Sequence, residues 1–147
     1  MPDKPDPMDL DAVLERLNAA LELEQRSVLE LVLTAGSVVG FEYHAVSSLL
    51  AEYALAELAD VRRLVEKIVA LGGRPSTTVA RPELAEDPAT AIDVLIDHEG
   101  EALTALHAVI PPTGQEPGSE ALEHLIEQVI MRKQEQVDSL LRARGKP

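Results

Sequence analysis

Apolar residues recur at intervals of three and four along four long segments of this 147-residue chain. This spacing is typical of one face of an α-helix, because about 3.6 residues complete each turn. It predicts four helices over about residues 9–39, 43–71, 88–110 and 119–144. Four long helices, each with one apolar face, favour an all-α helical bundle.

Short signals mark where these helices begin and end. Asp9 or Asp11 can cap the first helix, and Asp87 followed by Pro88 can start the third. The second helix stops before the glycine pair at 72–73. The first eight residues contain three prolines and predict a disordered arm, so that residues 9–144 form the bundle.

The connections between the helices differ in length. The first and the last are short, so the helices that they join are antiparallel. The middle connection, residues 72–87, can reach roughly 50 Å when extended. We therefore expect a crossover that runs the length of the bundle; a loose loop in an up-down-up-down bundle is the alternative.

Each predicted helix carries one charged residue at the centre of its apolar face: Glu24, Glu57, Glu99 and Lys133. The residues three, four and seven positions from Glu57 illustrate the pattern, since they include Leu50, Tyr53, Ala54, Val61 and Leu64. A charge in such a place belongs to the interior of the bundle. Four of them predict a buried polar site.

The four central residues should meet at one level of the bundle. Glu24 and Glu57 lie equally far from the turn that joins their helices, and Glu99 and Lys133 agree within about one helical turn. Polar companions follow at three residues, and they lie at the edge of the inward face: Asp60 after Glu57, and Gln136 after Lys133.

Composition narrows the function classes. The core must be aliphatic, because 46% of residues are hydrophobic but the chain has one Phe, two Tyr and no Trp. A net charge of −13 without a basic cluster disfavours nucleic acids and anionic membranes as partners. The absence of Cys excludes disulfides and thiolate chemistry, and no targeting segment or membrane-spanning run is present. We expect a cytoplasmic protein.

Inward carboxylates on several helices are the donors that iron or manganese accepts in di-iron carboxylate bundles. From about residue 14 to 141 the chain resembles the bacterioferritins of the ferritin-like superfamily. The resemblance rests on Leu17-Asn18 with Leu21 and Glu24, on Glu57 with the tail Val65–Pro75, on Glu99 before Leu106 and Ile110, and weakly on Val137–Leu140.

This resemblance implies a ferritin-like antiparallel four-helix bundle with a long crossover between the second and third helices. It further implies a homo-oligomer, a dimer or larger, that handles or stores iron. Glu24 and Glu99 match the family's terminal metal ligands, and Glu57 matches the bridging Glu of its first Glu-x-x-His motif.

The chain departs from the family pattern at three ligand positions. Asp60 stands in place of the first His, Lys133 in place of the second bridging Glu, and Gln136 in place of the second His. Asp60 can still bind a metal, whereas a charged Lys133 repels one and pairs with carboxylates instead. Leu58 replaces the haem-binding Met, so we expect no haem.

Other candidate groups lie around this site. We expect His44, His98 and His124 to be surface or loop residues, and His107 to be partly buried or at an interface. Tyr53, one turn before Glu57, either hydrogen-bonds a site carboxylate or packs as an ordinary core residue.

Four hypotheses for function remain open. The first is a protein with an altered dimetal centre, which binds at most one iron or manganese ion through Glu24, Glu57, Asp60 and Glu99 and lacks conventional ferroxidase activity. The second is a metal-free structural or interaction bundle with a buried Lys–carboxylate cluster. Active iron oxidation and storage, or action on an organic substrate at a one-metal site, are the further alternatives.

Overall fold

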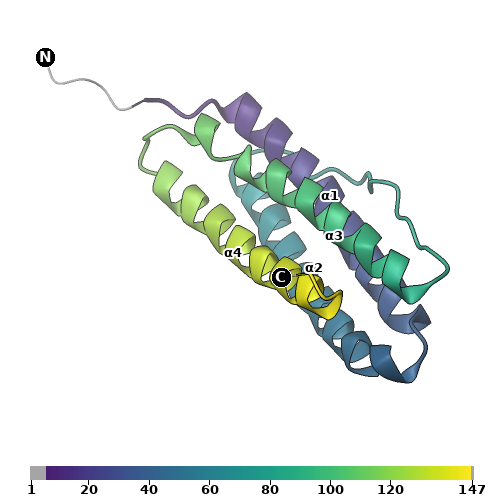
Figure 1. The fold of residues 1–147 in the computed structure, drawn as a ribbon. Coiled ribbons are helices and arrows are strands. Elements are labelled where there is room, and N and C mark those ends of the chain that lie inside the picture. The colour runs from purple at the N-terminus through teal and green to yellow at the C-terminus, as the bar shows by residue number, and fades with distance from the viewer. Residues whose placement is uncertain (1–5, 147) are drawn as a thin grey trace, which may run out of the picture.

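The structure, a computed structural model that describes residues 6–146, is a bundle of long helices without strands (Figure 1). Its elements are α1 (Leu10–Ser37), α2 (His44–Ala70), α3 (Pro88–His107) and α4 (Ser119–Ala143), with short 3-10 turns at Phe41–Tyr43 and Pro111–Thr113. This confirms the predicted all-α fold class. Between residues 6 and 146 no helix is long and apolar enough to cross a membrane. Residues 1–5 of the predicted arm lie outside the described part of the chain.

Side-chain caps fix the starts of two helices. Asp9, rather than Asp11, caps α1, because its carboxylate accepts the backbone N–H of Ala12 at 3.1 Å. Asp87 caps α3 in the same way through Thr90 at 2.9 Å. Each cap satisfies a backbone donor that has no partner within its helix.

The third helix ends at His107, a turn earlier than the predicted end at residue 110. Beyond His107 the backbone bonds tighten to three-residue spacing, as in the 3.1 Å bond from Val109 N to Leu106 O. Pro111 and Pro112 have no N–H with which to continue an α-helix. The two prolines therefore end α3 about one helical turn before Pro111.

The long connection between α2 and α3, residues 71–87, runs along α1 (Figure 1). Near the start of α1, the side chain of Asn18 accepts the backbone N–H of Ser76 at 2.7 Å. Farther along α1, the carboxylate of Glu30 accepts the backbone N–H of Glu83 at 2.8 Å. These contacts confirm the predicted crossover and bring the start of α3 to the end of the bundle where α1 finishes.

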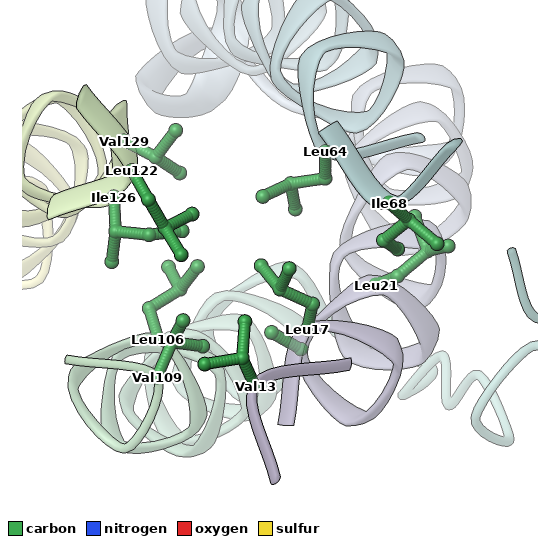
Figure 2. Close-up of a cluster of buried hydrophobic side chains, with 11 residues drawn as sticks. Val13, Leu17, Leu21, Leu64, Ile68, Leu106, Val109, Leu122, Ile126 and Val129 are labelled. Carbon is green, nitrogen blue, oxygen red and sulfur yellow. The ribbon is translucent and has the colours of Figure 1, made fainter. Parts of the chain in front are cut away.

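The apolar core is divided in two by the level of the predicted polar site. One half packs near the start of α1 and consists of Val13, Leu17, Ala20, Leu21, Leu64, Ile68, Leu106, Val109, Leu122, Ile126 and Val129. Figure 2 shows its labelled side chains converging from all four helices. The other half contains Leu31, Leu50, Ala54, Ile92, Leu95 and Leu140. On every helix, the central charged residue falls in sequence between these two halves.

Candidate functional site

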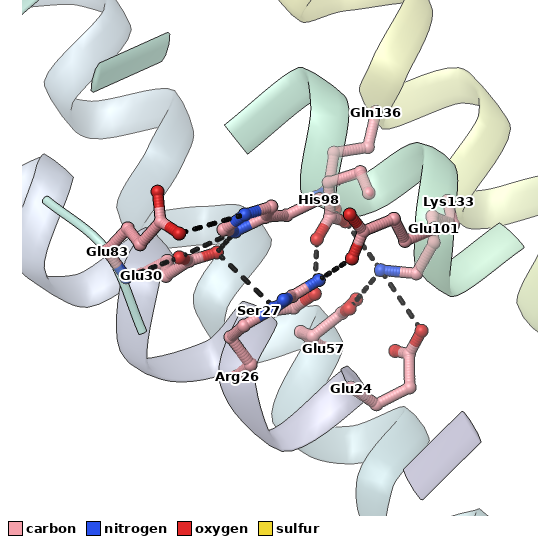
Figure 3. Close-up of polar contacts among 11 residues, drawn as sticks. Glu24, Arg26, Ser27, Glu30, Glu57, Glu83, His98, Glu101, Lys133 and Gln136 are labelled. Atoms are coloured by element: carbon pink, nitrogen blue, oxygen red, sulfur yellow. Dashed lines mark hydrogen bonds and ion pairs between the residues drawn. The ribbon is translucent and has the colours of Figure 1, made fainter. Parts of the chain in front are cut away.

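Glu24, Glu57, Glu99 and Lys133 are fully buried. Figure 3 shows Glu24, Glu57 and Lys133 pointing toward one another between the helices, and Glu99 joins them through its contact with Lys133. The Lys133 ammonium donates hydrogen bonds to Glu57 and to Glu99 Oε2, the latter at 2.5 Å. Its Nζ also lies 3.2 Å from Glu24 Oε1. The structure thus brings together the four residues that the sequence singled out, with the lysine at the point where three carboxylates converge.

A second cation, Arg132, completes this cluster. Its Nε donates to Asp60 Oδ2 at 2.5 Å, its Nη2 donates to Glu57, and its Nη1 donates to Gln136 Oε1 at 2.9 Å. The amide of Gln136 in turn donates to Glu99 Oε2 at 2.7 Å. Both companions, Asp60 and Gln136, are therefore part of one network with the central residues.

The sequence analysis did not identify Arg132. Its backbone position precedes that of Lys133 on α4, and its side chain keeps a quarter of its surface exposed. A long guanidinium reaches inward from such a position, since its stem can lie along apolar surface. Asp60 was the residue in the sequence that could have indicated such a partner, because a buried carboxylate requires a cation or several hydrogen-bond donors.

The cations determine the protonation of the cluster. Burial alone would raise the pKa of Glu57, but Lys133 and Arg132 hold that pKa below its usual range. Burial works to lower the pKa of Lys133, yet the three Glu side chains around it raise that pKa above its usual range. Lys133 is therefore an ammonium ion and Glu57 a carboxylate at neutral pH, and they form a buried ion pair.

Glu24 differs from the other carboxyl groups. Burial raises its pKa well above the ordinary 4.5, and the neighbouring Glu57 and Glu99 raise it further against the opposing effect of Lys133. Within the described residues neither of its oxygens has a hydrogen-bond partner, despite the approach to Lys133. Glu24 is therefore the carboxyl group of this cluster that is best suited to stay neutral, which brings the total charge closer to balance.

Replacing Glu24 by Gln should lower the free energy of unfolding at pH 7 by no more than about 1 kcal/mol, because Gln resembles a neutral carboxyl group. Glu57→Gln should cost about 3–5 kcal/mol, since it leaves buried cations without their carboxylate. The pKa of Glu24 in the folded state is raised above its ordinary value of 4.5. The stability that Glu24 contributes is therefore fully present below pH 4.5 and is lost as pH rises through the folded-state pKa.

Urea unfolding of the two variants at pH 5 and pH 8 checks this prediction. Relative to that of the wild type, the free energy of unfolding of Glu24→Gln should increase from pH 5 to pH 8. If Glu24→Gln loses as much free energy of unfolding as Glu57→Gln, then Glu24 is an ionised partner of Lys133.

A second polar cluster lies beside the first. His98, predicted to be a surface residue, is buried, and its Nδ1 lies 2.8 Å from both carboxylate oxygens of Glu30 (Figure 3). That prediction was wrong because the crossover covers this flank of α1 and α3. Ser27, also unforeseen, donates a hydrogen bond from α1 to Glu99 on α3.

The other candidate side chains lie away from the cluster. His44 and His124 are exposed, as predicted, whereas His107 is exposed in the single chain rather than partly buried. Tyr53 packs against the apolar half of the core that contains Leu50. Within residues 6–146 its hydroxyl makes no hydrogen bond to a site carboxylate, so the core-packing alternative holds.

The arrangement does not fit a conventional dimetal centre. The carboxylate oxygens of Glu57, Asp60 and Glu99 already contact the cations and the amide donor of the cluster. Lys133 lies between Glu57 and Glu99, where a metal ion bridged by carboxylates would require a negatively charged ligand and not an ammonium. Among the described residues, no group of three or more Asp, Glu or His side chains is disposed to hold a metal ion.

Comparison with known proteins gives one family. Residues 14–144 match the model of the ferritin-like domain. The comparison with curated proteins gave no match.

Solved structures with the same fold include a ferritin-like diiron-carboxylate protein from Bacillus anthracis, with a TM-score of 0.86 and 22% identity over 92% of this chain and 97% of that one. A dodecameric thioferritin, the bacterioferritin-related protein of Bacteroides fragilis, has a TM-score of 0.83 and 17% identity over 92% of this chain and 86% of its own. The bacterioferritin of Rhodobacter capsulatus, solved with a metal-free dinuclear site and haem iron, has a TM-score of 0.78 and 19% identity over 90% and 83%.

Proposed function

The chain belongs to the ferritin-like domain family, and from this premise we propose that it is a member in which a buried ion cluster of its own side chains replaces the dimetal centre. Such a protein binds at most one iron or manganese ion per chain and lacks conventional ferroxidase activity. Its role is that of a structural subunit in a homo-oligomer.

The position of Lys133 carries this proposal. Its ammonium contacts Glu57 and Glu99 and lies beside Glu24, which are the three residues that match the family's metal ligands. A buried positive charge at this point does electrostatically what a metal cation would do, because it balances converging carboxylates. Arg132 adds a second positive charge at Asp60, the position of a lost His ligand.

Iron oxidation tests the proposal. Fe(II) added anaerobically to the protein and then exposed to oxygen should be oxidised no faster than in buffer without protein. The variant Lys133→Glu with Gln136→His, which restores a Glu-x-x-His motif on α4, serves as the comparison in the same assay. Rapid, saturable oxidation by the wild type would overturn the proposal.

A second candidate is a site for a single metal ion next to Glu24. The observation in its favour is that both oxygens of Glu24 are buried without hydrogen-bond partners among the described residues. A bound ion would require this carboxyl group to lose its proton. Mn²⁺ should then raise the melting temperature of the wild type and leave that of Glu24→Gln unchanged; equal responses of the two proteins would exclude this candidate.

Oligomer formation is supported by an apolar face on the outside of α1 and α2. Leu55 is 71% exposed, Leu58 55% and Val32 54%. Apolar residues gathered on one surface are typical of protein interfaces. We propose that this α1/α2 face joins copies of the chain, and that it binds no haem, because Leu58 offers no donor atom to haem iron.

Leu58→Glu should dissociate the assembly, because a carboxylate in an apolar interface has no partner there. Light scattering coupled to size-exclusion chromatography measures the mass of the particle. Met131→Glu is the matched control, since Met131 is 64% exposed on α4 and lies outside this face. An unchanged mass for Leu58→Glu, or equal dissociation of both variants, would count against the proposed interface.

A further inference from the structure

The second polar cluster, made by Glu30, Glu83, His98, Arg26 and Glu101, contains a histidine whose orientation is fixed (Figure 3). His98 Nδ1 lies 2.8 Å from both oxygens of Glu30. The same carboxylate accepts the backbone N–H of Glu83 at 2.8 Å, which identifies it as an acceptor. The ring therefore carries its hydrogen on Nδ1, and the lone pair of the neutral imidazole is on Nε2.

The other ring nitrogen, Nε2, faces a second carboxylate. Nε2 of His98 lies 3.9 Å from Glu83 Oε1, which is too far for a hydrogen bond. Two ligands of one tetrahedral metal ion, with bonds of about 2.0–2.2 Å, stand roughly 3.3–3.6 Å apart, and wider angles separate them further. The side chain of Glu83 is 61% exposed on the crossover, so it is free to make the small shift that brings its carboxylate to this distance from His98 Nε2.

We propose that His98 Nε2 and the Glu83 carboxylate bind a divalent cation of borderline softness, such as Zn²⁺, with water completing the coordination. A histidine that donates its other N–H to a carboxylate is the arrangement that orients imidazole toward a metal and increases its basicity. Glu30 is the positioning residue in this site. With two protein ligands, the site differs in kind from the buried cluster and is independent of it.

The neighbouring charges are compatible with a cation. Arg26 is a neighbouring positive group, with its Nε 3.9 Å from Glu30 Oε1. Its guanidinium donates to the carboxylate of Glu101 at 2.7 Å, which balances its charge. The remaining carboxylates, Glu30 and Glu83, face the imidazole, so a cation bound at His98 Nε2 would lie in a negative electrostatic environment.

Calorimetric titration of the metal-free full chain with Zn²⁺ tests the site. His98→Gln should weaken the binding at least tenfold, and Glu83→Gln should weaken it several-fold. The matched control is His124→Gln, because His124 also lies near carboxylates, Glu120 and Glu127, but is 65% exposed and has no buried partner to orient it. Binding should be unchanged in this control.

Nitrogen-detected NMR of the histidine rings gives a second readout that needs no variant. Without metal, His98 should carry its hydrogen on Nδ1, and Zn²⁺ should shift the resonance of Nε2. Absence of Zn²⁺ binding, binding unaffected by His98→Gln, or a hydrogen on Nε2 in the neutral ring would each overturn the proposal.

Discussion

Lys133→Met should lower the free energy of unfolding at pH 7 by about 3–5 kcal/mol, the range measured when one partner of a buried ion pair is removed. Lys133 is fully buried and its Nζ contacts or lies beside three carboxyl groups. Methionine has a similar length but no charge, so most of the loss should be electrostatic. Glu57 and Glu99 must then either remain charged without a partner or take up protons on folding.

The pH dependence distinguishes this loss from a packing defect. Without the ammonium, the pKa values of the buried carboxyl groups in the folded state rise, so the stability of the variant falls as pH rises above their unfolded values. Urea unfolding from pH 5 to pH 8 should therefore show a growing deficit. Lys146→Met, at a 56% exposed position, is the control and should change little. A small deficit that is independent of pH would contradict the ion cluster.

The double variant Lys133→Glu with Gln136→His should convert the cluster into a metal site. It removes the central cation and places Glu-x-x-His on α4, opposite Glu24, Glu57 and Glu99. Without metal it should be much less stable than the wild type, because carboxylates crowd one another in the core. Mn²⁺ or Fe²⁺ should restore stability, by about 2.7 kcal/mol when the free metal exceeds its dissociation constant a hundredfold.

Thermal unfolding with and without Mn²⁺ measures this rescue. The control is Lys133→Met with Gln136→His, which removes the cation but adds no carboxylate. It should respond to the metal far less than the double variant. If Mn²⁺ fails to stabilise the variant with the restored motif, then Lys133 is not what excludes the metal.

The fold and the centre of the site could be predicted from periodicity. Glu24, Glu57, Glu99 and Lys133 interrupt apolar faces at matching heights, and helix geometry then requires them to meet. The crossover could be predicted from its length. Local rules of this kind suffice because each residue in question lies on the line that faces the bundle axis.

The partners at the edges could not be predicted in the same way. Arg132 reaches the cluster through a long side chain whose direction the backbone position does not fix. Glu30 and His98 lie beside the inward faces of α1 and α3, where a helical pattern predicts exposure, and they are buried because the crossover at Glu83 covers them. Burial by a segment without regular structure leaves no periodic signal in the sequence.

Anomalous diffraction from crystals grown with Mn²⁺ or Fe²⁺ tests most directly whether protein cations have replaced the dimetal centre. We expect no anomalous peak among Glu57, Asp60, Glu99 and Lys133, with the Lys133 ammonium bound to Glu57 and Glu99. A peak beside His98 would belong to the separate site proposed at His98 and Glu83. Two peaks bridged by Glu57, with Lys133 turned away from the carboxylates, would contradict the account.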